Sequence, residues 1–78
     1  MTHKYTWTPV EEMDLDDGTH TCYSSKTAQG KLVTLTQLWN DTWDVEKWYK
    51  TADGSMHFST LCNCKTLTSA KRWVARYY

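Results

Sequence analysis

An α+β fold is what this sequence predicts: a small antiparallel β-meander of four to five strands with one C-terminal α-helix packed on it. The chain has 78 residues, which suffice for a single domain (1–78) with a thin core. Five tryptophans and five tyrosines stand against one phenylalanine, and such ring-rich, threonine-rich chains favour strands. Short alternating segments are separated by turn residues, and the last segment has helical spacing.

Five segments show the alternation of large apolar and polar residues that is typical of β-strands. They lie near residues 5–10, 19–25, 32–39, 43–50 and 55–61. Pro9 places the first strand at a sheet edge or ends it, because proline cannot donate to a ladder. The third strand has the clearest pattern, with Val33, Leu35 and Trp39 on one face. Gly30, which accepts a positive φ, predicts the turn before it.

Residues 43–52 allow two structures. As a strand, the segment turns at Asp53-Gly54 into the next strand, which places Met56 and Phe58 inward. As a helix, it begins at Asp41, whose carboxylate can cap the first turn. The hairpin signal and the strand pattern that follows it favour the strand.

The last segment predicts a helix near residues 67–77, capped by Thr66. Its apolar residues recur at spacings of three and four and define one helix face: Leu67, Ala70, Val74 and Tyr77. A helix this short is not stable alone, so we expect this face to pack on the sheet.

Charge is balanced in total, with nine basic and nine acidic residues, but it is unevenly distributed. The first part of the chain holds an acidic loop of Glu11, Glu12, Asp14, Asp16 and Asp17. The last part is basic and holds Lys65, Lys71, Arg72 and Arg76 with no acidic residue. Zero net charge argues against a global polyanion binder. The uneven distribution allows two interpretations: the two ends attract each other in the fold or are simply solvated surfaces, or the protein presents one acidic and one basic face to a partner.

The C-terminal part of the chain resembles a known kind of protein. Its hairpin around Asp53-Gly54 is followed by the segments 58–61 (FSTL) and 69–74 (SAKRWV). This order is similar to the strand-strand-helix ending of small accessory proteins from phages and mobile elements, among them some anti-CRISPR inhibitors. The resemblance covers residues 43–78, and it implies a stoichiometric inhibitor of a host defence complex.

The main functional hypothesis is a non-enzymatic protein-binding module, with a phage-encoded inhibitor of the anti-CRISPR type as its specific form. Such an inhibitor blocks a host protein or nucleoprotein complex by steric or electrostatic contact. The acidic loop would engage basic residues of the partner. Exposed tryptophans would anchor the contact, with Trp7, Trp39 and Trp43 as candidates, because tryptophan dominates binding hot spots.

Two alternatives use other residues. A small nucleic-acid-binding module would contact phosphates through Lys65, Lys71, Arg72 and Arg76. A zinc-stabilised domain would use the two i, i+2 pairs His20/Cys22 and Cys62/Cys64, although one residue between ligands is shorter than usual zinc spacing.

Several further expectations come from what the sequence lacks. No orienting group or oxyanion loop accompanies the cysteines, so we expect no enzyme and no cofactor. Neither a signal peptide nor an apolar run long enough for a membrane span is visible, which predicts a cytoplasmic protein with no membrane partner. Exposed strand edges also allow a homodimer formed by sheet pairing.

Overall fold

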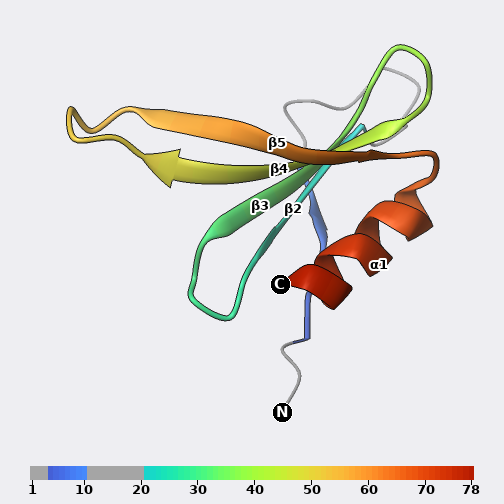
Figure 1. Ribbon diagram of the computed structural model, residues 1–78, viewed down its shortest axis with the longest axis horizontal. Coiled ribbons are helices and arrows are strands. Elements are labelled where there is room, and N and C mark those ends of the chain that lie inside the picture. Colours follow the sequence, from blue (N-terminus) through green and yellow to red (C-terminus); the bar gives the residue numbers. More distant parts are fainter. Residues whose placement is uncertain (1–3, 11–20) are drawn as a thin grey trace.

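Five antiparallel strands and one helix form the part of the chain that the computed structural model describes, residues 4–10 and 21–78 (Figure 1). The elements are β1 (Thr8–Pro9), β2 (Cys22–Lys26), β3 (Leu32–Gln37), β4 (Trp43–Lys50), β5 (Met56–Cys64) and α1 (Leu67–Tyr77). The α+β meander with a C-terminal helix is therefore confirmed. Residues 43–50 form a strand, so the helical alternative for this segment is wrong.

Tight turns join β2 to β3, β3 to β4 and β4 to β5, and the sheet order follows the chain order from β1 to β5. Before β3, Gly30 has a φ of 80°, and its N–H donates to the Thr27 carbonyl at 2.9 Å. At the predicted β4–β5 hairpin, Gly54 has a φ of 88°, and the Thr51 N–H donates to the Ser55 carbonyl at 2.9 Å. Glycine stands at both positions because a Cβ is strained at positive φ.

The strand predicted near 32–39 ends earlier, at Gln37. The chain turns at Leu38, whose N–H donates to the Thr42 carbonyl at 2.8 Å. Trp39 consequently lies in the turn and is 93% exposed. The prediction that Trp39 shares a face with Val33 and Leu35 is therefore wrong.

Strand β5 continues beyond the predicted 55–61 to Cys64. A β-bulge lies opposite the Val45–Glu46 step, and Leu61 is the extra residue. Cys62, after the bulge, packs against the core. The bulge changes which face the later residues of the strand present, and simple alternation along the sequence does not reveal it.

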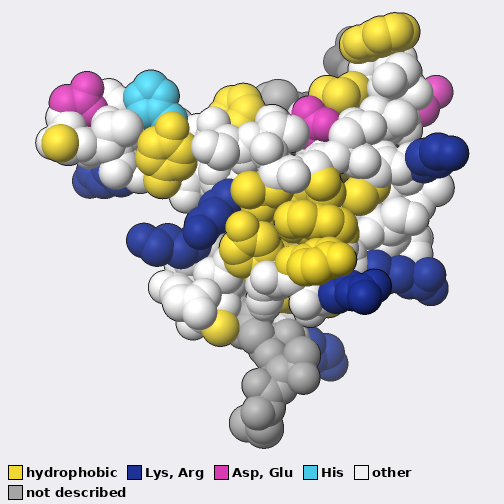
Figure 2. Space-filling model, viewed as in Figure 1, with side chains coloured by type: hydrophobic (Ala, Val, Ile, Leu, Met, Phe, Trp, Pro, Cys, Tyr) yellow, Lys and Arg dark blue, Asp and Glu magenta, His cyan; other side chains and the backbone are white. Residues whose placement is uncertain are grey.

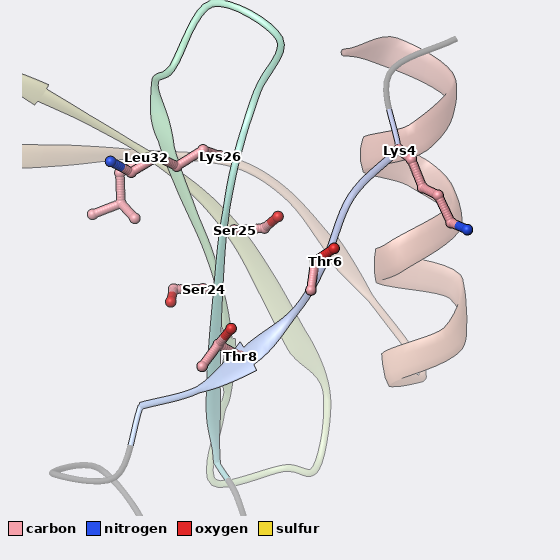
Figure 3. A pocket seen from close by; sticks show the side chains of 7 residues that line it. All are labelled: Lys4, Thr6, Thr8, Ser24, Ser25, Lys26 and Leu32. Carbon is pink, nitrogen blue, oxygen red and sulfur yellow. The ribbon is translucent and has the colours of Figure 1, made fainter.

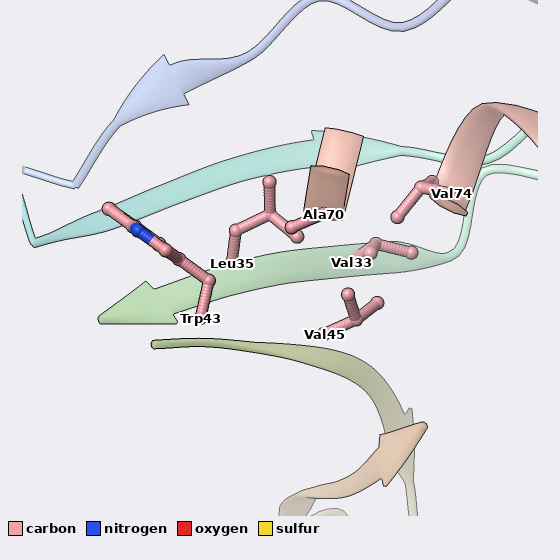
Figure 4. Packing of buried hydrophobic residues seen from close by; sticks show 6 residues of the cluster. All are labelled: Val33, Leu35, Trp43, Val45, Ala70 and Val74. Carbon is pink, nitrogen blue, oxygen red and sulfur yellow. The ribbon is translucent and has the colours of Figure 1, made fainter. Parts of the chain in front are cut away.

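The core lies between α1 and one face of the sheet, where side chains from β3, β4 and α1 meet (Figure 4). Its buried residues are Val33, Leu35, Trp43, Val45, Ala70 and Val74. Tyr5 and Trp7 precede β1 and pack partly against this cluster, with their rings stacked at a centroid distance of 5.8 Å. β1 itself is shorter than predicted, and it is an edge strand, as Pro9 requires.

Helix α1 begins where the sequence predicts. Thr66 Oγ1 accepts a hydrogen bond from the Ser69 N–H at 3.1 Å and so caps the first turn. Ala70 and Val74 are fully buried on the predicted apolar face, whereas Tyr77, expected on the same face, is 58% exposed. No helix in the described part of the chain has the length and apolarity needed to cross a membrane.

Candidate interaction surface

The face of the sheet opposite α1 is called the open face below. It is formed by the residues that alternate with the core residues along the strands. On β3, Thr34 and Thr36 alternate with Val33 and Leu35, and Glu46 lies beside these threonines on β4. Within the described residues α1 packs on the other face, so no helix covers this one.

The open face carries a groove of about 620 Å³. Strands β2 to β5 and the end of the β1 segment all contribute to its walls. The lining residues are Val10, Cys22, Ser24, Leu32, Thr34, Thr36, Glu46, Trp48, Met56 and Phe58. A mainly apolar hollow with a few convergent polar groups is the usual form of a binding site.

A hydrogen-bonded network crosses the floor of this groove. Trp48 Nε1 donates to Thr34 Oγ1 at 2.9 Å, and Thr34 Oγ1 donates to Glu46 Oε1 at 3.0 Å. Thr36 Oγ1 donates to the same oxygen at 2.8 Å. The indole N–H can only donate, so Thr34 Oγ1 accepts from it. The Thr34 hydroxyl proton is therefore directed to the Glu46 carboxylate.

Glu46 is 8% exposed, which is unusual for a glutamate that forms no ion pair with any of the described residues. Both of its hydrogen bonds end on Oε1, so the described residues donate none to Oε2. Burial of a carboxylate is costly unless it is hydrogen-bonded or paired. The two threonines offset part of that cost and orient the carboxylate in the groove.

Aromatic rings form one wall of the groove. Trp48 on β4 and Phe58 on β5 meet with ring centroids 4.9 Å apart and planes inclined by 44°. Phe58 is 48% exposed and Met56 is 51% exposed. Their predicted inward position is wrong, because on this part of β5, before the bulge, they belong to the face that α1 leaves uncovered.

The outer part of the β4–β5 hairpin projects from the body of the protein as a two-stranded arm (Figure 1). Its opposite face carries a second ring pair, Tyr49 and His57, with centroids 6.1 Å apart. Among the described strands β5 pairs with β4 alone, so its other side is an edge. The strand Met56–Cys64 contains no Asp, Glu, Lys or Arg, the residues that commonly protect such edges.

A smaller hollow of about 380 Å³ lies beside β1 (Figure 3). Thr6, Thr8 and Ser24 place hydroxyl groups around it. The amines of Lys4 and Lys26 point away from each other at its two ends (Figure 3). These cations do not converge, so the hollow has no focused charge for an anion.

Basic and aromatic side chains meet at the C-terminal end of α1. Trp73 contacts Tyr77 and Tyr78, with ring centroids 4.9 and 6.0 Å away. Arg76 lies 5.5 Å from the centre of the Tyr77 ring, and Lys47 lies 5.3 Å from that of Tyr78. Figure 2 shows a hydrophobic patch on this side of the molecule with Lys and Arg side chains at its borders.

The predicted basic residues are therefore only partly assembled. Lys71 lies over the Tyr23 ring at 5.3 Å, toward β2, while Arg72 and Lys65 are exposed. Lys47 and Lys31, which the charge count did not single out, line a groove of about 460 Å³ beside Tyr77 and Tyr78. Lys31 and Lys47 are far from α1 in sequence, so the sequence did not predict that they lie beside Tyr77 and Tyr78. The β3–β4 register brings the two lysines together.

The predicted tryptophan anchors have three different environments. Trp39 is 93% exposed and available for contact. Trp7 is half-buried against Tyr5. Trp43 is 7% exposed and belongs to the core, so its prediction as a surface anchor is wrong, because it opens β4 on the side that α1 covers. The acidic loop residues, Glu11, Glu12, Asp14, Asp16 and Asp17, lie outside the described residues.

The three cysteines do not come together. Cys22 lines the open-face groove, whereas Cys62 and Cys64 pack on the core side with their sulfurs 3.6 Å apart. His20 lies outside the described residues, and the described ones contain no cluster of three or more metal-ligating side chains. Burial, with the neighbouring Cys64 thiol, raises the pKa of Cys62 from 9.0 to about 12, which keeps this thiol protonated at neutral pH.

Comparison of the chain with protein-family models, with curated proteins and with solved structures gave no match. The geometry of its surfaces is therefore the basis for assigning a function.

Proposed function

We propose that this chain is a non-enzymatic protein-binding module whose contact surface is the open face, including the side of the β4–β5 hairpin that carries Phe58, and the edge of β5. The observation that carries the proposal is the groove of about 620 Å³ on the open face, which no helix covers in the described part of the chain. Half-exposed Phe58 and Met56 stand at its rim, where a partner can bury them. Aromatic and methionine side chains are enriched at protein interfaces, and a few such residues supply most of the binding energy.

The shape of the surface favours a protein over a small molecule. The groove is continuous with the projecting hairpin, because Trp48 and Phe58 line the groove and pair across β4 and β5. The uncharged edge of β5 adds backbone donors and acceptors to which an extended partner segment can pair. A macromolecular partner can use the groove, the rings and the edge together.

The specific form of the proposal is a phage-type inhibitor, of the anti-CRISPR kind, that blocks a host nucleoprotein complex by contact. It is supported by the resemblance of residues 43–78 to small phage accessory proteins. The electrostatic version, in which the acidic loop engages basic residues of the partner, stays a prediction, because that loop lies outside the described residues.

The test compares two faces of one hairpin. Phe58, on the open face, is 48% exposed and Tyr49, on the other face, is 46% exposed, so Phe58→Ser and Tyr49→Ser remove similar rings from opposite sides. Each tagged variant is used to capture partners from a nuclease-treated bacterial lysate, with quantification by mass spectrometry. We expect Phe58→Ser to lower recovery of the partner about tenfold or more and Tyr49→Ser to leave it nearly unchanged. Equal recovery with both variants would contradict the proposal.

A nucleic-acid-binding module is the second candidate, favoured by the interleaved cations and rings at the end of α1. Lys47, Arg76 and Tyr78 could contact phosphates and stack on bases. Binding of a labelled single-stranded DNA, followed by fluorescence anisotropy, should then weaken steeply with salt and with Arg76→Gln. A flat salt response would remove this candidate.

The homodimer that the sequence allows would use the free edge of β5. Two copies of an uncharged strand can pair about a two-fold axis without placing like charges opposite each other. Sedimentation velocity over a range of protein concentrations would show the dimer, and Ser59→Lys should weaken it because each copy would bring a positive charge to the pairing edge. A monomer at all concentrations would exclude this pairing.

A further inference from the structure

The carboxylate of Glu46 lies in a setting that the fold itself does not explain. It is 8% exposed on the floor of the open-face groove and is held by Thr34 and Thr36 through Oε1 alone. Among residues 4–10 and 21–78, no cationic side chain lines the groove. Lys26 and Lys50 end their strands on this face, but neither is among the lining residues.

The free-energy cost of burying the Glu46 carboxylate depends on what fills the groove. In the free protein, water can reach the groove and solvate the second oxygen of Glu46. A purely apolar occupant would exclude that water and leave Oε2 buried without a donor, and an unpaired buried charge is strongly unfavourable. An occupant that brings a positive charge removes this penalty. The groove is therefore matched to a cationic ligand rather than to a neutral apolar one.

The walls around the carboxylate identify the kind of cation. The indole of Trp48 is joined to Glu46 through Thr34, so its ring stands next to the carboxylate, and Phe58 packs against that ring. Aromatic faces attract a guanidinium group and can also cover an aliphatic stem. Arginine is more weakly hydrated than lysine and stacks on rings, which suits a partly desolvated aromatic groove.

A metal ion fits these residues less well. Within residues 4–10 and 21–78 no group of three or more His, Cys, Asp or Glu side chains surrounds a common point. The hydroxyl protons of Thr34 and Thr36 are directed to Glu46, so one carboxylate would have to hold the ion with little support.

We propose that the open-face groove receives an arginine side chain of a partner protein, with its stem against Trp48 and Phe58 and its guanidinium on Glu46. This inference rests on the proposed function, because it assumes that the groove contacts a protein, and it adds the chemistry of the partner residue. Glu46 then acts as the specificity determinant, while the rings at the rim supply apolar contact.

The test uses two peptide probes that differ in charge alone: acetyl-Leu-Arg-Leu-amide and acetyl-Leu-citrulline-Leu-amide. Citrulline keeps the shape of arginine but is neutral. Binding is measured by NMR titration of the ¹⁵N-labelled protein, followed at the Trp48 indole N–H, which lies in the groove. We expect the arginine peptide to bind at least about tenfold more tightly than the citrulline peptide.

Two variants locate the origin of that ratio. Glu46→Gln keeps a side-chain oxygen that can accept from both threonines but removes the charge, so we expect the ratio to fall to about one. Asp44→Asn removes the same charge two positions earlier on β4, where Asp44 Oδ1 accepts a hydrogen bond from Asn63 Nδ2 at 2.8 Å outside the groove lining. This control should keep the ratio of the unmodified protein.

The outcomes separate the two proposals. Equal binding of both peptides to the unmodified protein would overturn the arginine inference and leave the groove as a protein contact. If Glu46→Gln still binds the arginine peptide more tightly than the citrulline peptide, the inference would also be overturned. The same holds if Asp44→Asn loses this preference as fully as Glu46→Gln does, because the selectivity would then not come from Glu46. No change at the Trp48 indole with either peptide would overturn both the arginine inference and the groove as the contact surface.

Discussion

The two faces of the sheet come from the same strands but have opposite characters. On the covered face, Val33, Leu35 and Val45 are fully buried beneath α1. On the open face, Thr34 and Glu46 are nearly as buried, yet they form a polar network inside an apolar rim. The covered face can be explained by packing alone, whereas the open face buries polar groups where packing does not require them. This buried polar network lies outside the core, on the surface that we propose as the contact surface.

The sharpest test of this comparison substitutes the same residue type on both faces of β3. Leu35 is fully buried in the core, so Leu35→Ala should lower the free energy of unfolding by about 2–5 kcal/mol. Leu32 lines the open groove and is only half-buried, so Leu32→Ala should cost about 1 kcal/mol. Urea unfolding measures both. Similar losses would mean that the two faces contribute equally to stability.

A second test removes the centre of the polar network. Thr34→Val keeps the shape of the side chain but leaves Trp48 Nε1 without its acceptor and Glu46 with one hydroxyl donor fewer. We expect a loss of about 1–3 kcal/mol in urea unfolding, together with a shifted NMR signal of the Trp48 indole N–H. Thr36→Val, which removes the other hydroxyl bond to Glu46 but leaves the indole bonded, should cost less. Stability unchanged by Thr34→Val would show that the network is not structural.

The third test separates stability from binding at the rim. Phe58 is half-exposed and contacts Trp48, so Phe58→Ser should lower stability by only about 1 kcal/mol, the scale of one aromatic pair. Partner recovery should still fall about tenfold or more, although the variant stays folded. A large loss of stability in thermal unfolding would instead place Phe58 among the structural residues.

The last test concerns a pH dependence from the covered side, which leaves the free energy of unfolding at neutral pH unchanged. The pKa of Cys62 is raised from 9.0 to about 12 in the folded protein, mainly by burial. Above pH 9 the unfolded chain loses this proton while the folded chain keeps it, so the free energy of unfolding falls as the pH rises from about 9 to about 12. Cys62→Ala should make urea unfolding less pH-dependent in this window. An identical slope in the variant would show that Cys62 does not contribute.

Local signals in the sequence were sufficient for most of the secondary structure. The cap at Thr66, the turn at Gly30 and the hairpin at Gly54 depend on the residues next to them, and all three form as predicted. The alternation of Val33 with Thr34 likewise revealed the two faces of β3. These features follow from backbone preference and side-chain period, which neighbouring residues decide.

The candidate site was largely missed for a physical reason. No sequence pattern marked Glu46 as a site residue, and Phe58 was expected to face inward. The groove requires the register that places Thr34 beside Glu46, and the pairing of Trp48 with Phe58 across β4 and β5. Register across strands is a long-range property, and no local pattern specified which face of the hairpin would be covered.

The sequence by itself determined a small antiparallel meander of four to five strands with a C-terminal helix, because period, turn chemistry and capping act over a few residues. Only the tertiary structure decided which face of the sheet became the core, since that depends on where α1 docks. The docked helix made Trp43 a core residue, and the β3–β4 turn left Trp39 exposed. The face that α1 did not cover retained Glu46 in its apolar groove.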